Sequence, residues 1–178
     1  DAAISGGTVI EKQAAIGALG SIEGTAADAS LAKLVASMKA GTLPSSLAID
    51  VIDAASSRPQ LKEQVLAWSG SLASQDKLGS WILTLEGGDA ERGRQVVNFN
   101  SAAACLRCHM IEGTGGHAAP SLAGVASRYD RKGLLQSLVE PNAAVAQGYG
   151  PISAMPAMGT VLTPREVRDV VEYLSTLK

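Results

Sequence analysis

Aromatic residues are scarce in this chain of 178 residues, which contains one Phe, two Trp and three Tyr. The β-branched residues are also sparse, whereas Ala, Leu, Ser and Gly are abundant, so the composition offers little from which to build long strands. Because 46% of the residues are hydrophobic, the chain can nevertheless bury a substantial core. We therefore expect an all-α protein.

Strong charge and long apolar runs are also missing. The formal net charge of -2 leaves no basic field for nucleic acid, which is therefore not an expected partner. No apolar run approaches the roughly 20 residues of a membrane-spanning helix, so no membrane span is expected. The chain begins at Asp1 rather than at a Met, and we expect it to be a processed product or a fragment of a longer polypeptide.

The first half of the chain has apolar residues at helical spacing. The four stripes are Leu31, Leu34, Val35, Met38; Leu47, Val51, Ile52, Ala55; Leu61, Val65, Trp68, Leu72; and Leu78, Trp81, Ile82, Leu85. This pattern predicts four or five short helices packed as antiparallel pairs. The pairwise layout resembles HEAT-like helical repeats, although no clear sequence repeat is visible.

The helical pattern breaks at Glu86-Gly87-Gly88-Asp89, where Asp89 is a candidate N-cap for the next helix. Both Trp residues precede this point and all three Tyr residues follow it. We therefore expect two domains, a HEAT-like antiparallel helical domain over residues 1–88 and a second helical domain over residues 89–178.

The second domain contains two segments rich in Gly and Pro, residues 113–120 and 147–160, which are predicted to be loops that enclose a ligand. The run Thr163-Pro164-Arg165-Glu166 is a capping box with Pro at the first helical position, and it predicts a terminal helix.

Cys105, Cys108 and His109 form the pattern Cys-x-x-Cys-His, which has the spacing of c-type haem attachment. One helical turn can hold the two sulfurs where they form thioethers with the two vinyl groups on one edge of a porphyrin, and the following imidazole then reaches the iron. Covalent anchoring and proximal ligation of one haem c would thus come from one pentapeptide.

Three other interpretations of this motif remain open. A thioredoxin-like dithiol would lie at the end of a strand in an α/β sheet, and no such strand pattern surrounds the cysteines. A structural zinc site would need four ligands, but the chain has only two Cys and two His. A simple disulfide would leave His109 and the two loops without a role.

Over residues 89–178 the sequence resembles the class I cytochrome c family. Gly93 is similar to the small residue at which the first helix of the family crosses the last one, and Tyr173-Leu174 resembles the aromatic–Leu pair of that last helix. The segment 134–141, together with the preceding helical domain, is similar to haem-binding modules at the C-terminal ends of large predicted dehydrogenases in planctomycete-type bacteria. The resemblance implies a class I cytochrome c-like helical haem domain.

The resemblance also assigns roles to Pro120 and Leu122, which resemble the Pro-x-Leu segment of the family. It implies that the Pro120 carbonyl accepts a hydrogen bond from His109 and that Leu122 packs on the haem ring. Because this type of haem is attached on the outer side of the bacterial cytoplasmic membrane, the resemblance implies a periplasmic location.

The second axial ligand is expected to be Met155, because a thioether is soft, neutral and stabilises ferrous iron. Pro156 follows it and stiffens its loop, a position similar to the family's distal loop. Met158 in the same loop is the alternative. His117 lies only eight residues after His109, and we expect it to be an exposed loop residue.

The haem propionates would be costly to bury without partners, and Arg128 and Tyr149 are the expected donors. Tyr129 and Lys132 are further candidates, although each of these residues alone could serve another purpose.

Two functions follow from these residues. The first is an electron carrier rather than an enzyme: a mono-haem, His/Met-ligated c-type cytochrome that passes single electrons from a dehydrogenase, which could be fused upstream, to a downstream acceptor. The alternative is a haem-based sensor or peroxidase-like module with an open distal site. The role expected for residues 1–88 is to position the haem for a partner protein or a fused dehydrogenase domain, and the alternative is a passive spacer or stabilising cap.

Overall fold

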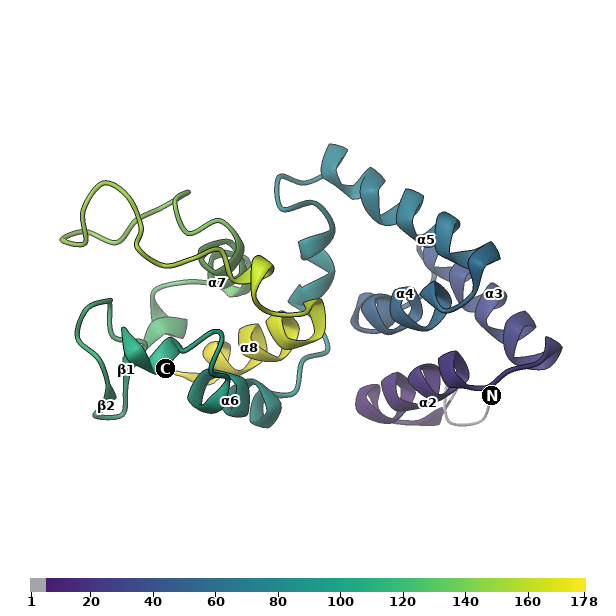
Figure 1. Ribbon diagram of the computed structural model, residues 1–178, viewed down its shortest axis with the longest axis horizontal. Helices are drawn as coiled ribbons and strands as arrows, with labels where there is room; N and C mark the ends of the chain where they lie inside the picture. Colours follow the sequence, from purple (N-terminus) through teal and green to yellow (C-terminus); the bar gives the residue numbers. More distant parts are fainter. Residues whose placement is uncertain (1–5) are drawn as a thin grey trace. The chain divides into compact units, whose positions relative to one another are not determined.

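The computed structural model describes residues 6–178 and is mostly helical. The β structure in this part of the chain is one two-stranded ribbon, so the expectation of an all-α protein is confirmed. The chain divides into two compact units, residues 1–83 and 84–178 (Figure 1). Among the described residues, no helix is both long enough and apolar enough to cross a membrane.

Four α-helices of the first unit lie within the described residues. They are α2 (Val9–Ser21), α3 (Thr25–Lys39), α4 (Ala48–Ser56) and α5 (Pro59–Ser71), with 3-10 turns η1 (Ser45–Leu47) and η2 (Leu72–Ser74). Helix α4 packs against α2, α3 and α5. Its buried face joins those of the other helices in one core that contains Ile16, Leu31, Val35, Val51 and Val65. This core contributes most of the stability of the unit, because apolar burial is the main favourable term in folding.

Three of the four predicted stripes lie on α-helices, but the fourth does not. Residues Gly79–Leu85 form the 3-10 helix η3 instead of an α-helix. Gly79 has a φ of 56°, a left-handed conformation that interrupts any α-helix extending through it. The sequence of α2 shows no single apolar stripe, because its own apolar and small residues are distributed over several sides of the helix.

The C-terminal end of α2 is held by the side chain of Arg58. The guanidinium donates to the carbonyl oxygens of Gly20, at 3.0 Å, and of Ile22, and it forms an ion pair with Asp28 at 2.5 Å. The carbonyls at the end of a helix have no partner within it, so this arginine satisfies groups that would otherwise need water.

The second unit has three α-helices: α6 (Ala90–Phe99), α7 (Arg131–Val139) and α8 (Pro164–Thr176). Between them lie the 3-10 turns η4 (Cys105–Arg107), η5 (Val125–Ser127) and η6 (Met158–Thr160), and the antiparallel strands β1 (Met110–Ile111) and β2 (Thr114–Gly115). The predicted capping box is present at the start of α8, where Thr163 and Glu166 bond reciprocally. Helices α6 and α8 cross (Figure 1).

The crossing of α6 and α8 requires glycine. A Cβ atom on Gly93 would overlap the carbonyl oxygen of Asp169 and would lie 2.8 Å from the Cβ atom of Tyr173. The buried carboxylate of Asp169 completes the crossing, because it accepts hydrogen bonds from the backbone N–H of Asp89 at 2.8 Å and from Arg92 Nε at 2.9 Å. The first and last helices of this unit are therefore in backbone contact.

Residues 84–88, which precede α6, also belong to the second unit. Arg131 Nε donates to the carbonyl of Leu85 at 2.7 Å, and the same guanidinium bonds Glu172 of α8 at 2.7 Å. Gly88 lies against the backbone of α8. The division observed between Leu83 and Thr84 thus falls five residues before the boundary that we placed after Gly88.

Candidate functional site

The two cysteines lie on a single tight turn. Ala104 adopts a left-handed conformation with a φ of 44°, which redirects the chain after α6 into η4. The N–H groups of Cys108 and His109 both donate to the carbonyl of Cys105, at 3.2 and 2.9 Å. Cys105 is half-buried, which raises the pKa of its thiol, whereas Cys108 is exposed. Both thiols and the adjacent imidazole therefore project from one short, hydrogen-bonded segment.

The imidazole of His109 is oriented by the carbonyl of Pro120. The distance from His109 Nδ1 to the Pro120 oxygen is 2.7 Å. A carbonyl oxygen can only accept, so Nδ1 carries the proton and Nε2 keeps its lone pair for a metal. Such a hydrogen bond also fixes the ring and makes it a better ligand.

The loop that precedes Pro120 is attached to the cysteine segment by backbone hydrogen bonds. The N–H groups of Gly116 and Ala119 donate to the carbonyls of Leu106 and Cys108, at 2.9 and 3.0 Å. A Cβ atom on Gly116 would overlap the carbonyl of Arg107, so glycine is required for this close approach. Between these two attachment points His117 is exposed, as expected.

A cavity of about 430 Å³ lies next to this segment, and it is lined mainly by apolar atoms. Helices α6, α7 and α8 contribute Val97, Leu134, Leu138, Val170 and Leu174 to its wall. The candidate residues that line it are Cys105, Cys108, His109, Pro120, Leu122, Arg128, Tyr129, Tyr149, Met155 and Met158. His117 and Lys132 are not part of this lining. Its volume is within the range of about 300–1,000 Å³ typical of ligand and cofactor sites.

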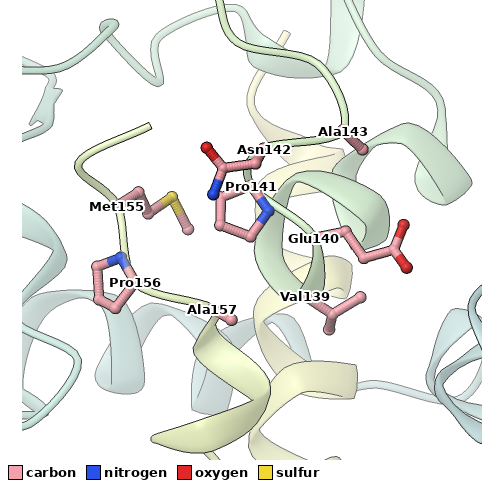
Figure 2. A pocket seen from close by; sticks show the side chains of 8 residues that line it. All are labelled: Val139, Glu140, Pro141, Asn142, Ala143, Met155, Pro156 and Ala157. Atoms are coloured by element: carbon pink, nitrogen blue, oxygen red, sulfur yellow. The ribbon is translucent and has the colours of Figure 1, made fainter. Parts of the chain in front are cut away.

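The two candidate thioethers differ in their surroundings. Met158 begins η6 and is only 3% exposed, whereas Met155 is half-buried in the irregular segment before it. Met155 also lines a neighbouring open depression of about 560 Å³, with Pro141 and Asn142 on the opposite side (Figure 2). Met155 thus belongs to the wall of both spaces, and Met158 lines only the apolar cavity next to the cysteines.

Arg128 contacts the loop around Pro120 directly. Its two terminal nitrogens donate to the carbonyls of Ser121, at 2.6 Å, and Ala123, at 2.9 Å. The guanidinium therefore braces the segment that orients His109. Tyr149, the other expected propionate partner, lines the cavity from the loop after α7 and is 43% exposed.

A comparison with families of known proteins matches residues 90–178, half of the chain, to the cytochrome c family. The chain belongs to the cytochrome c family. No curated protein and no solved structure matches it. Membership implies covalently bound haem c, a role in electron transfer and redox partner proteins. Cytochrome c domains are typically extracytoplasmic.

The residues around the cavity fit a haem better than a bare metal ion. The described part of the chain contains no group of three or more His, Cys, Asp or Glu side chains that could hold an ion, which argues against the zinc interpretation. A cytochrome c haem instead needs two thiols, one imidazole with a free nitrogen, a soft second ligand and apolar walls. All of these line the same cavity.

Several polar residues of this cytochrome c site were missed by the sequence analysis. Ser121, Ser137, Gln147 and Ser153 all line the cavity. Ser137 belongs to α7, and its hydroxyl donates to the carbonyl of Gly133 at 2.9 Å. Serine is one of the commonest residues in this chain, so no sequence signal distinguishes the three serines of the lining from those on the surface.

Proposed function

We propose that this chain is an electron-transfer cytochrome with a single haem c, and that it is not an enzyme. In this proposal, Cys105 and Cys108 form the two thioethers, and His109 and Met155 are the axial ligands. The observation that carries the proposal is the pairing of His109 Nδ1 with the Pro120 carbonyl, in a ring that lines the same cavity as both cysteines and Met155. The haem, when bound, supplies a one-electron couple of its iron.

The protein residues set the properties of that couple. The Pro120 carbonyl keeps Nδ1 of His109 protonated and leaves Nε2 for the metal. The apolar side chains of α7 and α8 exclude water, and a thioether ligand together with low polarity raises the reduction potential. Leu122 lines the cavity and is expected to pack on the ring. Arg128 and Tyr149 are the proposed partners of the propionates.

The observations support a closed iron site rather than an open one. Two thioethers, those of Met155 and Met158, line the cavity. The second histidine of the chain, His117, is exposed and not part of the lining, so it does not supply the distal His that a peroxidase-like site would need.

Carbon monoxide distinguishes the two functions. We expect the ferrous holoprotein at neutral pH to convert only slowly under carbon monoxide, because Met155 as sixth ligand would have to leave the iron first. Rapid and complete conversion to the carbon monoxide complex would favour the sensor and reject the carrier.

The proposed partners are a donor dehydrogenase and a downstream acceptor, with the protein in the periplasm. The first helical unit, which we propose to be HEAT-like, would hold the haem domain near a partner or a fused dehydrogenase. Tethering raises the effective concentration of the partners without any new contact at the haem. The test is to compare the rate at which the native donor reduces the full chain with the rate for residues 84–178 alone. Equal rates would contradict a positioning role.

A further inference from the structure

After α7 the chain forms a loop that leads to Met155. Two consecutive hydrogen bonds join the start of this loop to its end. Asn142 Oδ1 accepts the backbone N–H of Ser153 at 2.8 Å. Ser153 Oγ in turn accepts the backbone N–H of Met155 at 3.1 Å. We call residues 142–155 the Met loop and these two hydrogen bonds its neck.

One side of the neck is anchored to the core. Asn142 follows α7 after only two residues, and the chain between them is held by hydrogen bonds from the N–H of Glu140 to the Gln136 carbonyl, 2.7 Å, and from the N–H of Ala143 to the Glu140 carbonyl, 2.8 Å. Helix α7 is fixed by three buried leucines, Leu134, Leu135 and Leu138. The Asn142 side chain is therefore held on a rigid element.

The rest of the Met loop offers little support to Met155. Most of the residues between Ala143 and Ile152 are exposed, and Ile152 itself is 73% exposed. Gly148 and Gly150 have φ values of 90° and 88°, and glycine has the largest backbone freedom to lose. A segment with few buried contacts opens easily, so the loop tip cannot fix the position of the thioether.

We propose that Asn142 is a positioning residue for the axial thioether: through Ser153 it transmits the rigid position of α7 to the backbone of Met155. The proposal rests on the proposed function, in which Met155 ligates the iron. Figure 2 shows Met155 pointing toward Pro141 and Asn142 from the opposite segment. The open depression beside Met155 gives its side chain space to move when the neck is broken. The neck, rather than the loop tip, then determines how often the ligand leaves the iron.

The test uses the full-length holoprotein and compares Asn142→Ala with Asn142→Asp, which keeps the accepting Oδ1 atom. Ser153→Ala is a second variant that removes only the acceptor of the Met155 N–H. Ser127→Ala is the control, because Ser127 at the end of η5 is exposed and is not part of the cavity lining. The two measurements are amide hydrogen exchange at Met155 and the rate of carbon monoxide binding to the ferrous protein, which requires departure of the sixth ligand.

In Asn142→Ala and in Ser153→Ala, both rates should rise about fivefold, the change produced by losing one hydrogen bond of ordinary net strength. Asn142→Asp should restore both rates to within about twofold of the original protein, and Ser127→Ala should leave them unchanged. Rescue by aspartate would not occur if Asn142 acted through its amide NH2 group, because aspartate keeps only the oxygen acceptors.

The proposal is overturned if Asn142→Ala accelerates amide exchange at Ser153 but leaves both the Met155 amide and the carbon monoxide rate unchanged. Failure of the proposed function gives a different result: the original protein would then lack the sulfur-to-iron charge-transfer band, or Met155→Ala would leave that band in place. The exchange measurement at Met155 reports on the neck in either case.

Discussion

His109 Nδ1 and the carbonyl oxygen of Pro120 lie 2.7 Å apart although eleven positions separate the two residues. The contact depends on the bonds that attach the intervening loop to the cysteine turn and on Gly116, where no side chain fits. The proximal ligand is thus oriented by the same short piece of chain that carries the cysteines, so covalent attachment and ligand geometry are coupled.

Replacing both Cys105 and Cys108 by Ser should abolish covalent haem attachment, because a serine hydroxyl does not form the thioether. The original protein should keep its haem through denaturing electrophoresis, and the double variant should show no haem stain at the position of the polypeptide. Extraction of the haem from the original protein by acid acetone would contradict the thioether assignment.

Met155→Ala should abolish the ferric sulfur-to-iron charge-transfer band and lower the reduction potential, because the soft thioether that favours ferrous iron is lost. Met158→Ala should leave both nearly intact, although it creates a cavity at a position that is 3% exposed and should cost about 2–4 kcal/mol of stability. The absorption spectrum and a redox titration of both variants decide the matter. The opposite pattern would make Met158 the ligand.

Gly93→Ala should destabilise the second unit by about 3 kcal/mol, because its Cβ atom would overlap the backbone of Asp169 and force α6 and α8 apart. The matched control is Gly70→Ala in α5, where a Cβ atom has no neighbour within 4 Å and alanine is the better helix former. Urea unfolding followed at the haem absorption band for the first variant and by circular dichroism for both measures the difference. Equal stability of Gly93→Ala and the original protein would reject the close crossing.

The hydrogen bonds from Arg94 and Gln95 hold the pKa of Glu91 at about 2, well below its ordinary value of 4.5. Since the folded-state pKa is depressed, the stabilisation is fully present above pH 4.5 and is lost as the pH falls through about 2. A titration of the Glu91 carboxyl by NMR should give the low pKa in the original protein and a pKa raised toward the ordinary 4.5 in Arg94→Ala, where the hydrogen bond from Gln95 remains. An ordinary pKa in the original protein would show that the pair is not formed in solution.

A fragment of residues 84–178 should be more stable than one of residues 89–178 by about 1.5 kcal/mol. The shorter fragment loses the Leu85 carbonyl that accepts the hydrogen bond of Arg131, and a hydrogen bond to a charged group is worth about 1.5–3 kcal/mol. Chemical denaturation of the two haem-loaded fragments provides the comparison. Identical midpoints and slopes would show that residues 84–88 add nothing to the second unit.

Much of the fold follows from local patterns that act over a few residues. The stripes on α3, α4 and α5 and the capping box at Thr163 need only neighbouring side chains and backbone groups, and they are present in the structure. The stripe ending at Leu85 failed as an α-helix because Gly79 takes a left-handed conformation, a choice that depends on its surroundings.

The candidate site divides in the same way. The pentapeptide from Cys105 to His109 by itself indicated haem, because attachment chemistry requires those residue types at that spacing. The composition by itself determined the all-α class. By contrast, only the tertiary structure shows that Ser153 lies beside Asn142 and that Arg128 donates to the backbone carbonyls of Ser121 and Ala123. It also shows that Met155 lines both the apolar cavity and the open depression. These contacts join segments that are not adjacent in the sequence, and no sequence pattern indicates that they meet. The contacts form only when whole helices pack together, so no local preference predicts them.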